Sequence, residues 1–149
     1  MTYATQADLV ERFGADEVRQ LTDRHMPAQG AIVAAVLDRA IADAAGLIDA
    51  HLAGRYVLPL STPHPAQLVR VACDITRYFL HDLSAPDLVR EHYEDAVKWL
   101  RDVAAGKVPL IGATGLEVQA SAQPSGAAVA RPYAADAAFG DDFSTRYAP

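Results

Sequence analysis

The sequence predicts a mainly α protein, a compact bundle of about five helices followed by an extended C-terminal tail with a possible short β-hairpin. Apolar residues recur at three- and four-residue steps in successive segments, and these segments end at glycine or proline. After Gly106 the composition changes to alanine, glycine, serine and proline with few charges. We therefore expect a helical bundle domain over residues 1–106 and an extended C-terminal arm over 107–149.

Two short helices are expected at the N-terminus. Thr5 followed by Asp8 is typical of a helix start, because the hydroxyl accepts from free backbone amides and the acid suits the positive helix end. This first helix should stop at Gly14. A second helix is expected over 16–22, and a loop with proline and glycine over 23–30.

The third expected helix is the longest, over about 31–53. We expect Gly54 to end it in the left-handed conformation, which glycine adopts without steric cost. The segment YVLPL (56–60) should then be extended, because its proline forbids a helix. The apolar face of this helix comprises Ile32, Val36, Ala40, Ala44, Leu47, Ile48 and Leu52.

The fourth and fifth helices are expected over about 66–81 and from about residue 87 to Gly106. Ser84 and Asp87 have the spacing of a capping box around Pro86, which suits a first helical turn. The apolar stripe of the fourth helix comprises Leu68, Val71, Ala72, Ile75, Tyr78 and Phe79, and its polar stripe Arg70, Asp74, Arg77 and His81. The fifth carries Val89, Tyr93, Ala96, Val97, Leu100 and Val103 inward.

Five residues are candidates for contacts between subunits. Arg70, Asp74 and Arg77 alternate in charge at four- and three-residue steps, so they can bridge one another along an exposed helix face. The alternative is a face that meets a neighbouring subunit, where arginine is enriched. Arg55 and Tyr56 pose the same choice: both are common interface anchors, but Tyr56 could simply close the core beneath its loop.

The C-terminal arm is a candidate binding segment rather than a core-forming one. Two short runs, 108–111 and 116–119, could be strands on either side of GATG (112–115). The polar end of the chain spaces its aromatic residues too widely for them to pack on one another. Its candidate anchors are Arg131, Tyr133, Phe139, Phe143, Arg146 and Tyr147.

Composition excludes several classes of protein. The net charge of −6 argues against a domain that reads DNA sequence, because such domains present a basic face to phosphates. The single cysteine, Cys73, allows no intramolecular disulfide and indicates folding in a reducing compartment. The N-terminus lacks the pattern of a signal peptide, and no apolar run is long enough to span a membrane.

The sequence shows no pattern typical of an active site, so we expect no enzyme activity, no catalytic residue, no metal and no cofactor. The histidines at 25, 51, 64, 81 and 92 lack the short, regular spacing of zinc ligands. Cys73 and His81 would lie two helical turns apart on different faces, too far for a nucleophile and its base. The sequence contains neither the phosphate-binding loop GxxxxGK[ST] nor the dinucleotide-binding motif GxGxxG.

Five phrases, in order, resemble the small head–tail adaptor (connector) proteins of Mu-like tailed phages and prophages. They are YATQADLVERFG (3–14), EVRQLTDR (17–24), GRYVLPL (54–60), LVRVACDITRYFLHD (68–82) and YEDAVKWLRDVAAGKVPL (93–110). The resemblance covers about residues 2–112. It departs at the 23–30 loop, where HMPAQG stands in place of the acidic, glycine-containing turn common among the relatives.

The resemblance implies a structural protein that forms a homo-oligomeric ring between the capsid portal and the next neck or tail component, such as a stopper. The implied ring has about twelve subunits, and genomic DNA passes through it without sequence-specific binding. The protein would be made in the bacterial host cytoplasm and end in the neck of the virion, with no membrane partner. The tail would bind the portal. The alternatives are a non-catalytic chaperone or regulatory binding module of phage origin, and, third, a small hydrolase.

Overall fold

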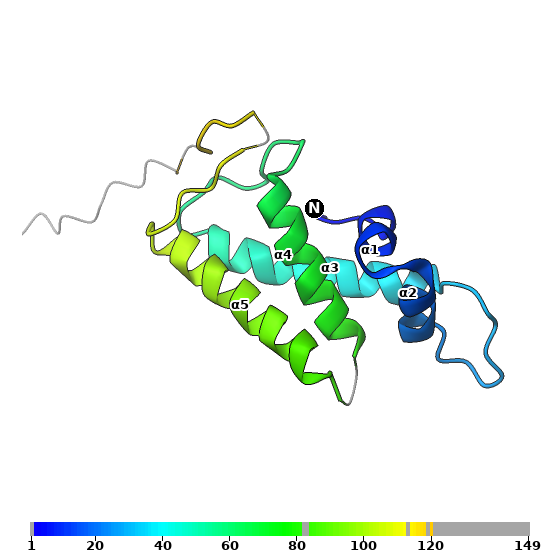
Figure 1. The fold of residues 1–149 in the computed structure, drawn as a ribbon. Helices are drawn as coiled ribbons and strands as arrows, with labels where there is room; N and C mark the ends of the chain where they lie inside the picture. Colours follow the sequence, from blue (N-terminus) through cyan, green and yellow to red (C-terminus); the bar gives the residue numbers. More distant parts are fainter. Residues whose placement is uncertain (1, 82–83, 113, 119, 121–149) are drawn as a thin grey trace, which may run out of the picture.

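A computed structural model describes all residues of the chain except 1, 82–83, 113, 119 and 121–149. Its described part contains five helices: α1 (Gln6–Phe13), α2 (Ala15–Thr22), α3 (Ala34–Leu52), α4 (Ala66–Leu80) and α5 (Asp87–Ala104). Helices α3, α4 and α5 pack on one another, and α1 and α2 lie together beside α3 and α4 (Figure 1). The mainly α fold predicted from the apolar periodicity is confirmed.

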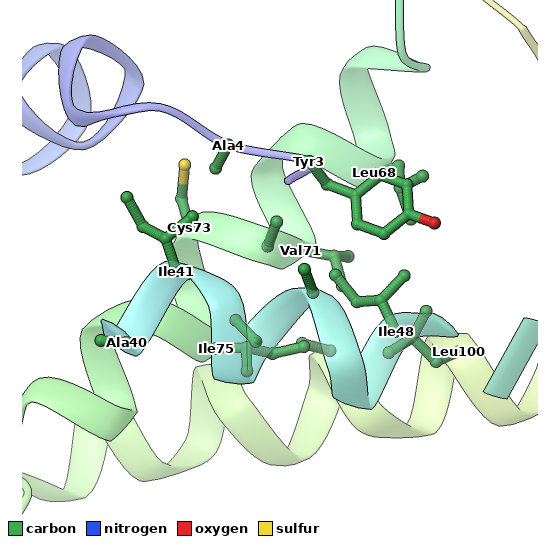
Figure 2. Packing of buried hydrophobic residues seen from close by; sticks show 14 of the residues in the cluster. Tyr3, Ala4, Ala40, Ile41, Ile48, Leu68, Val71, Cys73, Ile75 and Leu100 are labelled. Atoms are coloured by element: carbon green, nitrogen blue, oxygen red, sulfur yellow. The ribbon is translucent and has the colours of Figure 1, made fainter. Parts of the chain in front are cut away.

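The hydrophobic core lies where the three long helices meet. Side chains from the N-terminal segment, α3, α4 and α5 share one interior (Figure 2). Ile48, Ile75 and Leu100, one from each long helix, are all completely buried. The buried face of α3 is wider than its predicted stripe, because Leu37, Ile41 and Ala45 are buried as well, whereas Leu47 is only partly buried. A helix covered on two sides buries more than one stripe.

The N-terminal segment is fastened to the bundle by side-chain hydrogen bonds. The predicted start of α1 is confirmed: Thr5 Oγ1 accepts from the Asp8 amide at 3.3 Å, and Asp8 Oδ2 accepts from the Thr5 amide at 2.7 Å. The buried Tyr3 donates its hydroxyl to Asp49 on α3, and its ring meets His64 edge-on at 5.0 Å. These contacts attach Tyr3 to α3 and to the segment just before α4.

Two predictions about α3 are wrong at its ends. The helix begins at Ala34 rather than at residue 31, because the Val33 amide donates to Thr22 Oγ1 at 3.2 Å and so belongs to the loop. Gly54 does not adopt the left-handed conformation. Leu52 O instead accepts from the amides of Arg55 and Tyr56, at 2.9 and 2.8 Å, and this turn ends the helix.

The predicted capping box of α5 is also wrong. Pro86 is the N-cap, and it offers no side-chain hydrogen bond. The Asp87 carboxylate accepts instead from Arg90 Nη2 at 2.6 Å, one turn further along the helix. At the other end the prediction holds: the chain leaves α5 through Gly106, whose φ of +75° is strained for other residues.

The segment after α5 folds back as a small hairpin rather than as two strands. Val118 N donates to Leu110 O and Gly112 N to Leu116 O, both at 2.7 Å, with an isolated antiparallel bridge between Ile111 and Glu117. We call residues 110–112 and 114–118 the C-terminal hairpin. Leu110 is buried and Val118 packs against the core, so the hairpin rests on the bundle.

Candidate assembly surfaces

The charged stripe predicted on α4 divides between two surroundings. Arg77 turns toward the N-terminal helices, where its Nε donates to Glu17 Oε1 at 2.6 Å. Its guanidinium carbon also lies 4.6 Å from the centre of the Phe13 ring, a cation–π contact. Only 19% of the Arg77 side chain is exposed. Arg77 therefore pairs with Glu17 rather than with Asp74, and it ties α4 to α1 and α2.

Arg70 and Asp74 form an ion pair beside a cleft between α4 and α5, with 3.8 Å between Nε and Oδ2. Burial raises the pKa of Asp74, and the neighbouring His92 and Arg70 oppose that rise. The cleft, which Asp95 and Trp99 also line, holds about 80 Å³. Small-molecule sites hold roughly 300–1,000 Å³, so this cleft is small for a ligand site. Arg70, 58% exposed, is thus the member of the predicted stripe that a neighbouring protein can reach.

Arg55 and Tyr56 directly follow the C-terminal end of α3, and both take part in packing. Tyr56 is 2% exposed, and its backbone forms an antiparallel bridge with Ala120. The Arg55 guanidinium lies 5.9 Å from the Tyr56 ring and occupies the space where a Cβ on Gly106 would stand. In the monomer Tyr56 closes the core, and Arg55 covers the turn at the end of α5.

The five predicted interface residues therefore do not form one patch. Arg70 and Asp74 share the α4–α5 face, and Arg77 faces α1 and α2. Arg55 and Tyr56 stand in the turn that follows α3, with Arg55 against Gly106. The six predicted tail anchors lie outside the described residues: Arg131, Tyr133, Phe139, Phe143, Arg146 and Tyr147.

Cys73 and His81, considered above as a nucleophile and its base, are both affected by burial. Cys73 is completely buried, and burial raises the pKa of its thiol from 9.0 to about 11. Burial, helped by the positive charge of Arg77, lowers the pKa of His81. Among the described residues, no three His, Cys, Asp or Glu side chains converge as a metal site would require. No described helix combines the length and apolar character of a membrane span.

Sequence reasoning missed two surface features. A groove of about 620 Å³ runs between α3 and the end of α4. Its lining combines apolar side chains such as Val36 and Phe79 with the charged Arg24, Arg39 and Asp43. Large apolar side chains are also exposed at both ends of α3, among them Met26 in the 23–30 loop and Leu116 in the C-terminal hairpin. The sequence offered one signal of this exposure: Met26 stands in a loop that contains proline and glycine, and loops lie at the surface.

Comparison with known proteins agrees with the helical pattern. The family described as Bacteriophage Mu, Gp36 matches residues 3–129, which include all five described helices. The Mu-like prophage FluMu protein gp36 of Haemophilus influenzae is 39% identical over 108 residues, which cover 72% of this chain and 74% of that protein. Gene product J of Escherichia phage Mu is 36% identical over 126 residues, 85% of each chain.

These matches define a class of phage and prophage proteins. The chain belongs to the Bacteriophage Mu Gp36 family. Membership makes it a protein of phage origin and supports a structural or assembly role in a phage.

Proposed function

We propose that this protein is a head–tail adaptor: a homo-oligomeric ring, of about twelve subunits, that joins the capsid portal to the next neck or tail component. The observation that carries the proposal is the family match across the whole bundle to a phage Mu protein. The protein acts without catalysis or cofactor, is made in the host cytoplasm and resides in the neck of the virion. Genomic DNA passes through the ring without base-specific contacts.

A closed ring requires a heterologous interface, with two different surfaces on each subunit. The α4–α5 face supplies a candidate for one of them. Arg70 is exposed there beside Asp74, whose side chain is 13% exposed, and the pair leaves room for an acidic group of a neighbour on Arg70. Arginine on such a rim aligns subunits and speeds their encounter more than it tightens binding.

The test reverses the charge of Arg70 and compares it with a matched arginine. Arg90 is a suitable control, because its side chain is 53% exposed and pairs with Asp87 at a three-residue step on α5. With purified portal, the parent protein and Arg90→Glu should form a complex with several adaptor copies per portal, measured by mass photometry. Arg70→Glu should remain monomeric and fail to complete heads.

The outcomes separate the candidate functions. A parent protein that stays monomeric with excess portal and leaves heads complete when its gene is deleted would overturn the adaptor proposal. A stable monomer that binds one soluble phage protein would favour the chaperone or regulatory module. Rings formed equally well by Arg70→Glu would leave the adaptor proposal standing and remove this face from the interface.

A further inference from the structure

We draw no further inference here: the strongest candidate, the groove of about 620 Å³ between α3 and the end of α4, sets the charged Arg39 and Asp43 among apolar side chains such as Phe79, and nothing in the described part of the structure shows what covers it.

Discussion

At the scale of single residues, Ile75 decides whether the three long helices can pack. It is completely buried in α4, among side chains of α3 and α5 (Figure 2). Ile75→Asp should unfold the domain, because it buries a charge with no partner. Ile75→Ala should remain folded and lose roughly 2–5 kcal/mol of unfolding free energy, measured by urea denaturation.

Leu47 provides the contrast at this scale. Its place in the apolar stripe predicts that Leu47→Asp would unfold the domain as Ile75→Asp should. In the structure, however, Leu47 is only partly buried, at the edge of the core. An aspartate there can turn toward water. Leu47→Asp should therefore fold with a lower melting temperature, and a cooperative loss of the far-ultraviolet signal as complete as that of Ile75→Asp would contradict the assigned core.

Cys73 should be chemically silent in the native protein. It is completely buried, and a thiol pKa raised to about 11 leaves on the order of a thousandth of it as thiolate at pH 8. Iodoacetamide should label it slowly in buffer and rapidly in denaturant, as mass spectrometry can follow. Rapid labelling of the folded protein would show that α1 opens away from α4 readily.

At the scale of elements, the attachment of α1 and α2 to α4 depends on Arg77. The reversal Arg77→Glu would set two carboxylates against each other at Glu17 and remove the contact with Phe13. The unfolding free energy should fall by roughly 1.5–3 kcal/mol, the usual range for a hydrogen bond to a charged group. This variant would therefore confound a test of assembly, which is why Arg70 serves there.

Two further variants check the role of Arg77. Arg19→Glu is the matched control, because Arg19 pairs with Asp16 at the exposed surface of α2 at a distance of 3.0 Å and should contribute little. The double variant Glu17→Arg, Arg77→Glu should recover part of the lost stability. If Arg77→Glu melts like the parent, the ion pair does not hold the N-terminal helices.

Helices were predictable where local chemistry decides, as in the Thr5–Asp8 start of α1 and the exit of α5 through Gly106. Predictions failed where a group distant in the sequence binds a backbone amide or a side chain. Thr22 claims the Val33 amide and delays α3, an interaction across the 23–30 loop that periodicity does not report. The partner of Arg77 is equally invisible, because Glu17 lies 60 residues earlier in the chain.

At the scale of the whole molecule, the C-terminal tail is predicted to bind the portal. Removal of residues 131–149 deletes the aromatic and arginine side chains Tyr133, Phe139, Phe143, Arg131 and Arg146 together with Tyr147, while the described bundle stays intact. The truncated protein should keep the parent melting temperature and lose portal binding in a pull-down. Unchanged capture by the portal would place the docking surface on the bundle.

The candidate surfaces show what a sequence can predict at this scale. The arginine and tyrosine positions were identified by residue type, but their exposure follows from packing, and Tyr56 is buried whereas Arg70 is not. A pocket beside Leu116, between the segment 60–65 and the C-terminal hairpin, joins segments about 50 residues apart in the chain. No local pattern brings such segments together, because their meeting depends on how α3, α4 and α5 stack.

The meeting of Arg55 with Gly106 has a consequence for how this chain can change over evolutionary time. An alanine at position 106 would need both a strained backbone and a displaced guanidinium. The φ of +75° favours glycine at position 106 whatever side chain stands at 55, whereas the flexible Arg55 guanidinium could move aside at little cost. Position 55 should therefore vary more freely than position 106, and a shorter side chain at 55 should not by itself admit an alanine at 106.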